Sequence, residues 1–174
     1  MDAPTATSPS PALPLHERRG ASAVVLAVLL AVNAVVAFGG SLAVRSSVDG
    51  WYAEAEKAPW SPPNWLFAPA WTVLYVLMAV AVWLVWRRGG WRPASGALWL
   101  YIGQLVLNAA WTPVFFGAQL LWVGLVVIVA LDVMVVLTIL AFRRPSRVAA
   151  WLLAPYLAWI VFATSLNAAV AVLN

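Results

Sequence analysis

Long uninterrupted apolar segments alternate with short charged ones along almost the whole chain. The first covers residues 21–44 and the second covers 67–86, and neither contains a charged side chain. Each is long enough for an α-helix to cross the hydrocarbon core of a bilayer, which takes about 20 residues. The pattern therefore predicts membrane-spanning helices rather than the amphipathic elements of a soluble domain.

The apolar sequence that follows divides into three more spans. Residues 94–131 carry no charge and are too many for one crossing. We expect a break within 113–119, because Pro113 and Gly117 disfavour a continuous helix. The remaining helices are then predicted at about 94–115, 119–142 and 148–173. The predicted fold class is an all-α membrane protein, a bundle of five transmembrane helices.

The chain before the first span differs in composition. Residues 1–20 are rich in Pro, Ser, Thr and Ala and are predicted to form a disordered N-terminal tail. The first span is longer than the core of a signal peptide, so we expect it to remain in the mature protein, with cleavage near 41–44 as the alternative. The five-helix transmembrane domain is thus expected over residues 21–174.

The connection between helices 1 and 2 is long and aromatic. It covers residues 45–66, and the stretch 51–75 holds four Trp, four Pro and two Tyr. Because Pro restricts the backbone, we expect a structured loop, with a short interfacial helix within 50–57 that ends before Pro59. One interpretation is an aromatic belt at the membrane surface. The other is a loop that closes over an aromatic-lined pocket between helices.

Tryptophans near the predicted helix ends are expected to anchor the protein at the membrane interface, where indoles prefer the level of the headgroups. These residues are Trp60, Trp65, Trp83, Trp86, Trp91, Trp99, Trp122 and Trp151.

Composition agrees with a membrane protein and narrows the chemistry. The chain is 64% hydrophobic and 9% charged, with a mean hydropathy of +0.91. It has no Cys, and its single His, His16, lies in the tail. The usual ligands of zinc, copper and haem iron are therefore missing from the spans, and we expect no metal site. No basic run is long enough to indicate a nucleic-acid partner.

The basic residues predict an orientation. Eight of the ten Lys and Arg residues lie before helix 1 or in the second and fourth loops, and the other two lie in the first loop. By the positive-inside rule, the N-terminus is cytoplasmic, and the long loop and the C-terminus lie outside. We expect the membrane to be a bacterial plasma membrane.

Asp132 is the one ionisable residue in the middle of a predicted span. Its charge would cost about 2.5–3.5 kcal/mol, which the Leu, Ile and Val of that helix outweigh. Intramembrane acids indicate function, here proton coupling or pairing with a ligand. The alternative, which we favour slightly, is a protonated side chain hydrogen-bonded to a neighbouring helix or a dimer partner.

Three spans carry aromatic and amide residues at helical spacing, so that each group lies on one helix face. The groups are Trp71 and Tyr75 on helix 2, Gln104, Asn108, Trp111 and Phe115 on helix 3, and Trp159, Phe162 and Ala163 on helix 5. Ordinary packing with interhelical hydrogen bonds is one interpretation. A shared pocket beneath the long loop is the other.

Four sequence blocks resemble the TspO/MBR family, the tryptophan-rich sensory proteins and the mitochondrial translocator or peripheral benzodiazepine receptor. They are Trp51-Tyr52 with residues 57–63, and residues 70–75, 104–111 and 155–167, in the order and spacing of the family. The resemblance implies a five-helix bundle, often dimeric, that binds porphyrins and related tetrapyrroles and synthetic isoquinoline carboxamides. Animal members also bind cholesterol, but their motif needs a basic residue after Tyr156, which this chain lacks, so we do not expect cholesterol.

The resemblance implies a tetrapyrrole such as protoporphyrin IX as ligand, no required cofactor, and a homodimer in the bilayer. Trp and Tyr can stack on the porphyrin face, and its propionates need donors such as indole N–H or hydroxyl groups. The expected ligand-binding residues are Trp51, Tyr52, Pro63, Trp71, Tyr75, Asn108, Trp111, Phe115, Trp159, Phe162 and Ala163.

Three functions stay open at this point. The leading one is a porphyrin-binding receptor or carrier linked to tetrapyrrole and stress responses. The second is an enzyme that degrades porphyrin with light and oxygen, because Trp71 and Trp159 match the two tryptophans that the resemblance links to this reaction. The third is a scaffold whose pocket modulates partner proteins.

Overall fold

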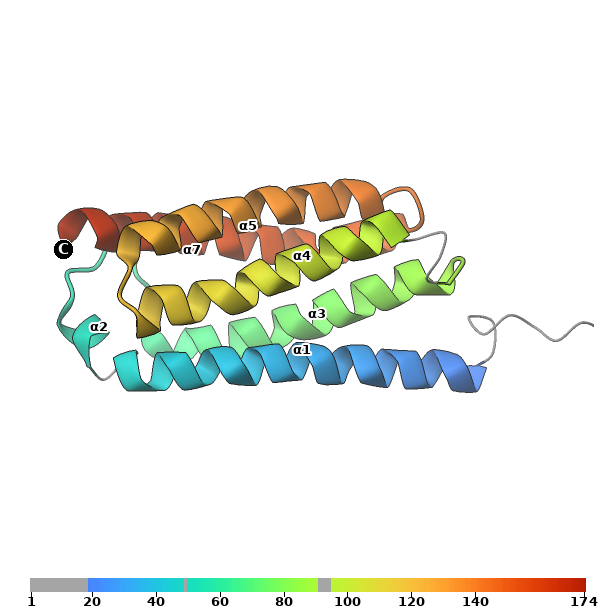
Figure 1. Cartoon of the computed structure of the whole chain (residues 1–174), viewed down its shortest axis with the longest axis horizontal. Coiled ribbons are helices and arrows are strands. Elements are labelled where there is room, and N and C mark those ends of the chain that lie inside the picture. Colours follow the sequence, from blue (N-terminus) through green and yellow to red (C-terminus); the bar gives the residue numbers. More distant parts are fainter. Residues whose placement is uncertain (1–18, 49, 91–94) are drawn as a thin grey trace, which may run out of the picture.

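The computed structural model describes residues 19–48, 50–90 and 95–174. Within these ranges, long helices lie side by side along the longest axis of the molecule (Figure 1), and five of them are long and apolar enough to cross a membrane. These ranges contain no strand. The predicted fold class, an all-α membrane bundle, is therefore confirmed.

The helix bounds follow the predicted spans to within a few residues, and the expected interfacial helix is present in the loop. In chain order the elements are α1 (Arg19–Val48), α2 (Trp51–Glu54), the 3-10 turn η2 (Asn64–Leu66), α3 (Phe67–Arg87), α4 (Ser95–Thr112), the π turn η3 (Pro113–Gly117), α5 (Leu121–Phe142), α6 (Arg147–Leu152) and α7 (Ala154–Leu173). The predicted tail, with His16, and Trp91 in the second loop lie outside the described residues.

The fifth span is not the single helix that the sequence predicted. It divides into α6 and α7 at Leu153. Pro155 has no N–H to donate to the carbonyl of Trp151 four residues earlier, so the α-helical ladder is interrupted there. Between the third and fourth spans, the helix passes through Pro113 as the π turn η3, and Gln119 makes the reversal with a left-handed φ of 57°.

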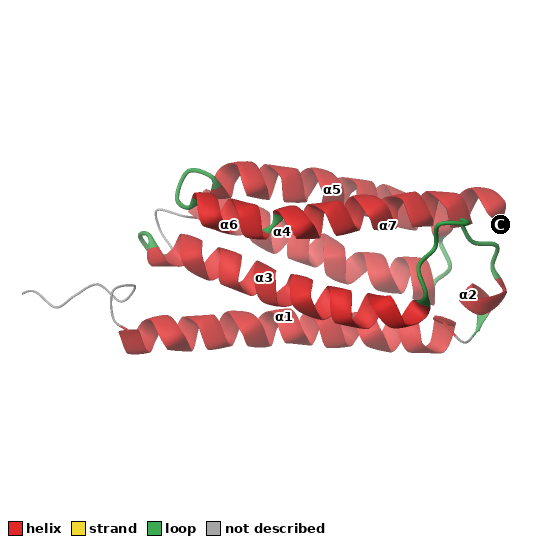
Figure 2. Ribbon diagram, turned by 180° about the vertical axis from the view of Figure 1, so that it is seen from behind, coloured by secondary structure: helices red, strands yellow, loops and turns green. Residues whose placement is uncertain are grey.

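Each long helix packs against particular neighbours in the bundle. Helix α4 packs against α5, α5 against α7, α1 against α3, and α6 against α3. Helix α1 lies at the edge of the bundle (Figure 2), and the α1–α3 loop and the C-terminus share one end. Met78, Leu131 and Tyr156 are among the fully buried side chains of the core.

The predicted interface tryptophans that the structure describes differ in exposure. Trp99, Trp122 and Trp151 are 70%, 60% and 76% exposed. Trp86, by contrast, is only 2% exposed and belongs to the core, so its prediction as an interface anchor is wrong. Its place on the buried face of α3, beside Val82 and Val85, explains the difference.

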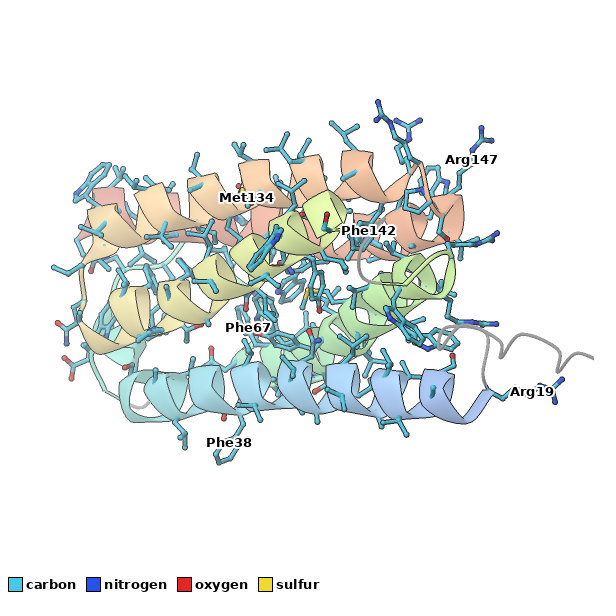
Figure 3. All side chains as sticks on the ribbon, turned by 45° about the vertical axis from the view of Figure 1, so that its right-hand side comes forward. Arg19, Phe38, Phe67, Met134, Phe142 and Arg147 are labelled. Carbon is cyan, nitrogen blue, oxygen red and sulfur yellow. The ribbon has the colours of Figure 1, made fainter. Side chains whose placement is uncertain are left out.

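One end of the bundle carries most of the described cations. Arg19 at the start of α1 and Arg147 at the start of α6 lie at the same end (Figure 3). The arginines that close α3 and α5 lie at this end too. Lys57 is in the loop at the opposite end. This asymmetry is the basis of the predicted orientation, which stays a prediction.

Candidate functional site

A chain of buried polar side chains joins three helices in the middle of the bundle. Tyr75 on α3 donates its hydroxyl to Asn108 Oδ1 at 2.5 Å. Asn108 on α4 donates Nδ2 to the hydroxyl of Tyr156 on α7 at 3.1 Å. Tyr156 in turn donates to Gln104 Oε1 at 2.9 Å. Gln104 and Asn108 are one turn apart on α4, so both amides reach the same hydroxyl.

An aromatic cluster lies at the loop end of α4, next to this polar chain. Trp111 stacks on Phe115 with ring centroids 5.6 Å apart. From the loop, Trp51 and Tyr52 contact Phe115 edge to face at 5.9 and 6.2 Å. The Trp111 indole N–H donates to Asn167 Oδ1 at 3.1 Å, which ties α4 to α7. Helix α2 therefore docks on the end of the third span through its aromatic residues.

Hydrogen bonds fix this docking. The carbonyl of Phe116 accepts from Trp51 Nε1 at 3.0 Å and from the Ser47 hydroxyl at 2.8 Å. Carbonyls at the end of a helix lack hydrogen-bond donors within the helix, so these two side chains donate to the Phe116 carbonyl instead. Lys57 Nζ lies 4.9 Å from the centroid of the Tyr52 ring. Burial raises the pKa of the Tyr52 hydroxyl above its ordinary value, so Tyr52 is neutral at physiological pH.

A line of half-buried rings follows the seam between α3 and α7. Trp71 lies tilted on Tyr75 at 5.5 Å and meets the edge of Tyr156 at 6.2 Å. Trp159 contacts Phe67 at 5.8 Å and Phe162 at 5.9 Å. Phe67 is half-buried, whereas Phe38 points outward from α1 (Figure 3). We call Phe67, Trp71, Trp159 and Phe162 the aromatic seam.

Among the described residues, the aromatic seam contains one buried polar atom without a hydrogen-bond partner. Trp159 Nε1 is buried and has no hydrogen-bond partner among the described residues. A buried donor of this kind costs about 1–3 kcal/mol when it is left unsatisfied. Helix α3 packs closely against α6 but touches α7 at few positions. The indole N–H therefore belongs to a pair of helices that touch at few positions.

The long loop runs down α7 towards the aromatic seam (Figure 2). The side chain of Asn174 accepts from the N–H of Glu56 at 3.0 Å and donates to its carbonyl at 3.1 Å. Further along, Trp60 Nε1 donates to the Ser165 hydroxyl at a long 3.4 Å. The loop then enters α3 at Phe67, beside Trp159. Pro63 is exposed in this loop and starts the 3-10 turn η2.

The structure arranges the predicted binding residues in three adjoining groups rather than around one point. Trp71, Tyr75 and Asn108 meet at Tyr156, and Trp111 and Phe115 meet the loop. The third group is the seam pair Trp159 and Phe162, and Ala163 is buried on α7 between Trp159 and Asn167. Pro63 has no contact with these rings that the structure describes.

Sequence reasoning missed two buried tyrosines. Tyr156 joins the amides of α4, and its position three residues before Trp159, on the same helix face, was the available signal. Tyr101 exchanges hydrogen bonds of 2.8 and 3.1 Å with Asn33, which links α4 to the edge helix α1. Asn33 is the only amide of the first span, so a partner on another helix could have been expected.

Asp132 on α5 is hydrogen-bonded to α7. Its Oδ2 accepts from the Thr164 hydroxyl of α7 at 2.8 Å, and Thr164 also donates to the Ile160 carbonyl. The other carboxyl oxygen, Oδ1, is buried without a partner among the described residues. Asp132 is thus hydrogen-bonded to a neighbouring helix. The protonation state of Asp132 stays a prediction.

These features define a class of protein: a five-helix membrane bundle whose aromatic loop covers a buried site of rings and amides. The TspO/MBR family profile matches residues 25–173. The chain is 45% identical over 150 residues to the Tryptophan-rich protein TspO of Archaeoglobus fulgidus, covering 86% of this chain and 96% of that protein. The chain belongs to the TspO/MBR family and is a multi-pass membrane protein.

Other relatives span eukaryotes and bacteria. The Translocator protein of sheep, Ovis aries, is 43% identical over 132 residues, which cover 75% of this chain and 78% of the relative. The Tryptophan-rich sensory protein of Cereibacter sphaeroides is 40% identical over 119 residues, which cover 68% and 73%. All three aligned lengths are far longer than any single span, so the similarity extends over several helices of the bundle.

Proposed function

We propose that this chain is a membrane receptor or carrier that binds porphyrins at the aromatic seam. The observation that carries the proposal is the buried Trp159 indole N–H, unpaired within the described part of the chain, in a line of half-buried rings. A flat, apolar ligand with acceptor groups at its edge matches this combination. The family membership and the position of the loop over the seam support the same interpretation.

A porphyrin has an apolar face that suits the indole rings of the seam and carboxylates that suit the polar groups of the loop. Trp71 on α3 and Trp159 on α7 can each offer a ring face, and stacking contributes about 0.5–1.5 kcal/mol per pair beyond burial. Propionates would lie towards the loop, where a carboxylate can replace the long Trp60–Ser165 contact. Trp159 Nε1 would gain an acceptor. The proposal includes a homodimer in a bacterial plasma membrane, with the loop outside.

One observation favours the enzymatic alternative. Trp71 and Trp159, the residues expected to react in light-dependent porphyrin breakdown, both lie on the seam, and Trp71 contacts Tyr75 and Tyr156. Illuminating the purified protein with protoporphyrin IX in air separates the two functions. An enzyme yields a product whose formation stops when both tryptophans are changed to Phe, whereas a receptor or carrier leaves the porphyrin as it would be in detergent alone.

The binding proposal is tested by titrating protoporphyrin IX into purified protein and following its visible absorbance. Trp71→Leu removes both ring contacts of the indole, and we expect binding to weaken about tenfold, or about 1.4 kcal/mol. Trp122→Leu is the matched control, because Trp122 is 60% exposed on α5. It should leave the affinity within about twofold. Equal losses in the two variants would contradict the site.

A further inference from the structure

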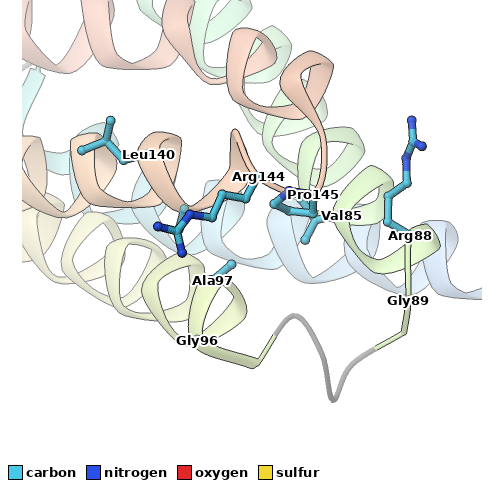
Figure 4. Close-up of a pocket in the computed structure, with 9 residues that line it drawn as sticks. Val85, Arg88, Gly89, Gly96, Ala97, Leu140, Arg144 and Pro145 are labelled. Carbon is cyan, nitrogen blue, oxygen red and sulfur yellow. The ribbon is translucent and has the colours of Figure 1, made fainter.

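A cavity opens at the cation-rich end of the bundle, away from the aromatic seam. It has a volume of about 890 Å³ and lies between the end of α3, the start of α4 and the end of α5 (Figure 4). Its walls include Val85, Ala97 and Leu140, and its polar groups include Arg88 and Arg144. The end of α5 is distant in sequence from the other two helix ends, so the cavity is a product of the fold.

The polar side of this cavity is positive. Arg88 and Arg144 both line it with exposed side chains; Arg144 extends towards Ala97, whereas Arg88 extends away from the other lining residues (Figure 4). No carboxylate in the described ranges pairs with either of them. The first turn of α4 adds N–H groups without helical acceptors, together with the positive end of the helix dipole. A Cβ built on Gly96 meets no atom of the described residues within 4 Å, so these residues leave room for an anion at this backbone. These features select a negatively charged group.

The other side of the cavity is apolar and reaches the lipid. Val85, Ala97 and Leu140 belong to the last or first turns of membrane-spanning helices. Leu140 is 50% exposed on the outer face of α5, so this wall continues into the surface that meets acyl chains. The cavity therefore lies at the depth of the headgroups, with its charge towards water and its apolar wall towards the bilayer.

We infer that this cavity binds the phosphate headgroup of an anionic phospholipid, with the acyl chains lying along α5. Basic pockets between transmembrane helices are suited to such headgroups, because Lys and Arg near the membrane surface attract anionic lipids. By the positive-inside rule, the lipid would come from the cytoplasmic leaflet. This site is independent of the porphyrin proposal, since it uses other helix ends and other residues.

Native mass spectrometry of the purified full chain tests the inference. The protein is titrated with phosphatidylglycerol and with phosphatidylcholine of the same acyl chains. We expect tighter binding of phosphatidylglycerol, and the double variant Arg88→Gln with Arg144→Gln should lose this preference by roughly an order of magnitude. The matched control, Arg143→Gln with Arg147→Gln, removes the same charge from the same end but from outside the cavity, and should keep the preference.

Three outcomes overturn the inference. Equal losses in the two double variants would mean that general surface charge attracts the lipid. Equal binding of the two lipids by the unmodified protein would remove the anionic preference itself. Displacement of phosphatidylglycerol by an excess of inorganic phosphate would assign the cavity to a free anion instead. Thermal unfolding followed by circular dichroism shows that each variant is folded before it is titrated.

Discussion

The hydroxyl of Tyr156 is the group on which the buried polar chain depends most. The change Tyr156→Phe removes one oxygen from a fully buried side chain. It breaks the 3.1 Å bond from Asn108 and the 2.9 Å bond to Gln104, and leaves an amide donor and an amide acceptor buried without partners. Interhelical hydrogen bonds in membranes average about 0.6 kcal/mol and reach about 1.7. Two of them predict a loss of roughly 1–3 kcal/mol in unfolding free energy.

The assay is reversible unfolding in mixed micelles, titrated with a denaturing detergent and followed by circular dichroism. Tyr52→Phe is the matched control, because it removes the same atom from a tyrosine that is also buried, and the structure describes no hydrogen bond of its hydroxyl. We expect this control to change the unfolding free energy by less than about 0.5 kcal/mol. A loss for Tyr156→Phe no larger than that of the control would refute the reasoning.

Three further predictions follow from the packing, the acid and the charge asymmetry. A Cβ on Gly124 would meet Asn167 Oδ1 at 3.2 Å, whereas one on Gly103 would meet only the flexible end of a methionine, at 2.6 Å. In the same assay, Gly124→Ala should therefore lower the unfolding free energy by about 1 kcal/mol more than Gly103→Ala. Asp132→Asn should keep porphyrin affinity within about threefold and independent of pH, and lost binding by a folded variant would show that the charge matters. A reporter fused after Asn174 should behave as extracytoplasmic, and a cytoplasmic signal would overturn the predicted orientation.

Much of the fold could be predicted because the bilayer restricts it. Span length and the absence of charge set the five helices, and Pro113 indicated where the third and fourth spans separate. The break in the fifth span was missed, although Pro155 is visible in the sequence. Proline is tolerated in membrane helices, so its presence alone does not say whether a helix bends, continues or divides.

For the candidate site, the sequence predicted which residues share a helix face, but not which side chains bond to each other across helices. Spacing placed Trp71 with Tyr75 and Asn108 with Trp111, and those pairs lie where the faces suggested. The sequence contained no information on which amide meets which hydroxyl, because that depends on helix rotation and crossing. For the same reason Tyr156 was overlooked as the hub, and Trp86 was mistaken for an interface anchor although it faces the core.

The central claim, that a porphyrin lies against α7 at the aromatic seam, is tested most directly by enlarging a small side chain of that helix. Ala163 is buried one turn after Trp159, so a Phe there would occupy room that a flat ligand needs. Protoporphyrin IX affinity, measured by titration of folded protein, should fall about tenfold in Ala163→Phe, or about 1.4 kcal/mol. Ala169→Phe, on another face of the same helix, should change it by less than about twofold. Equal effects from the two changes, or none from either, would contradict the account.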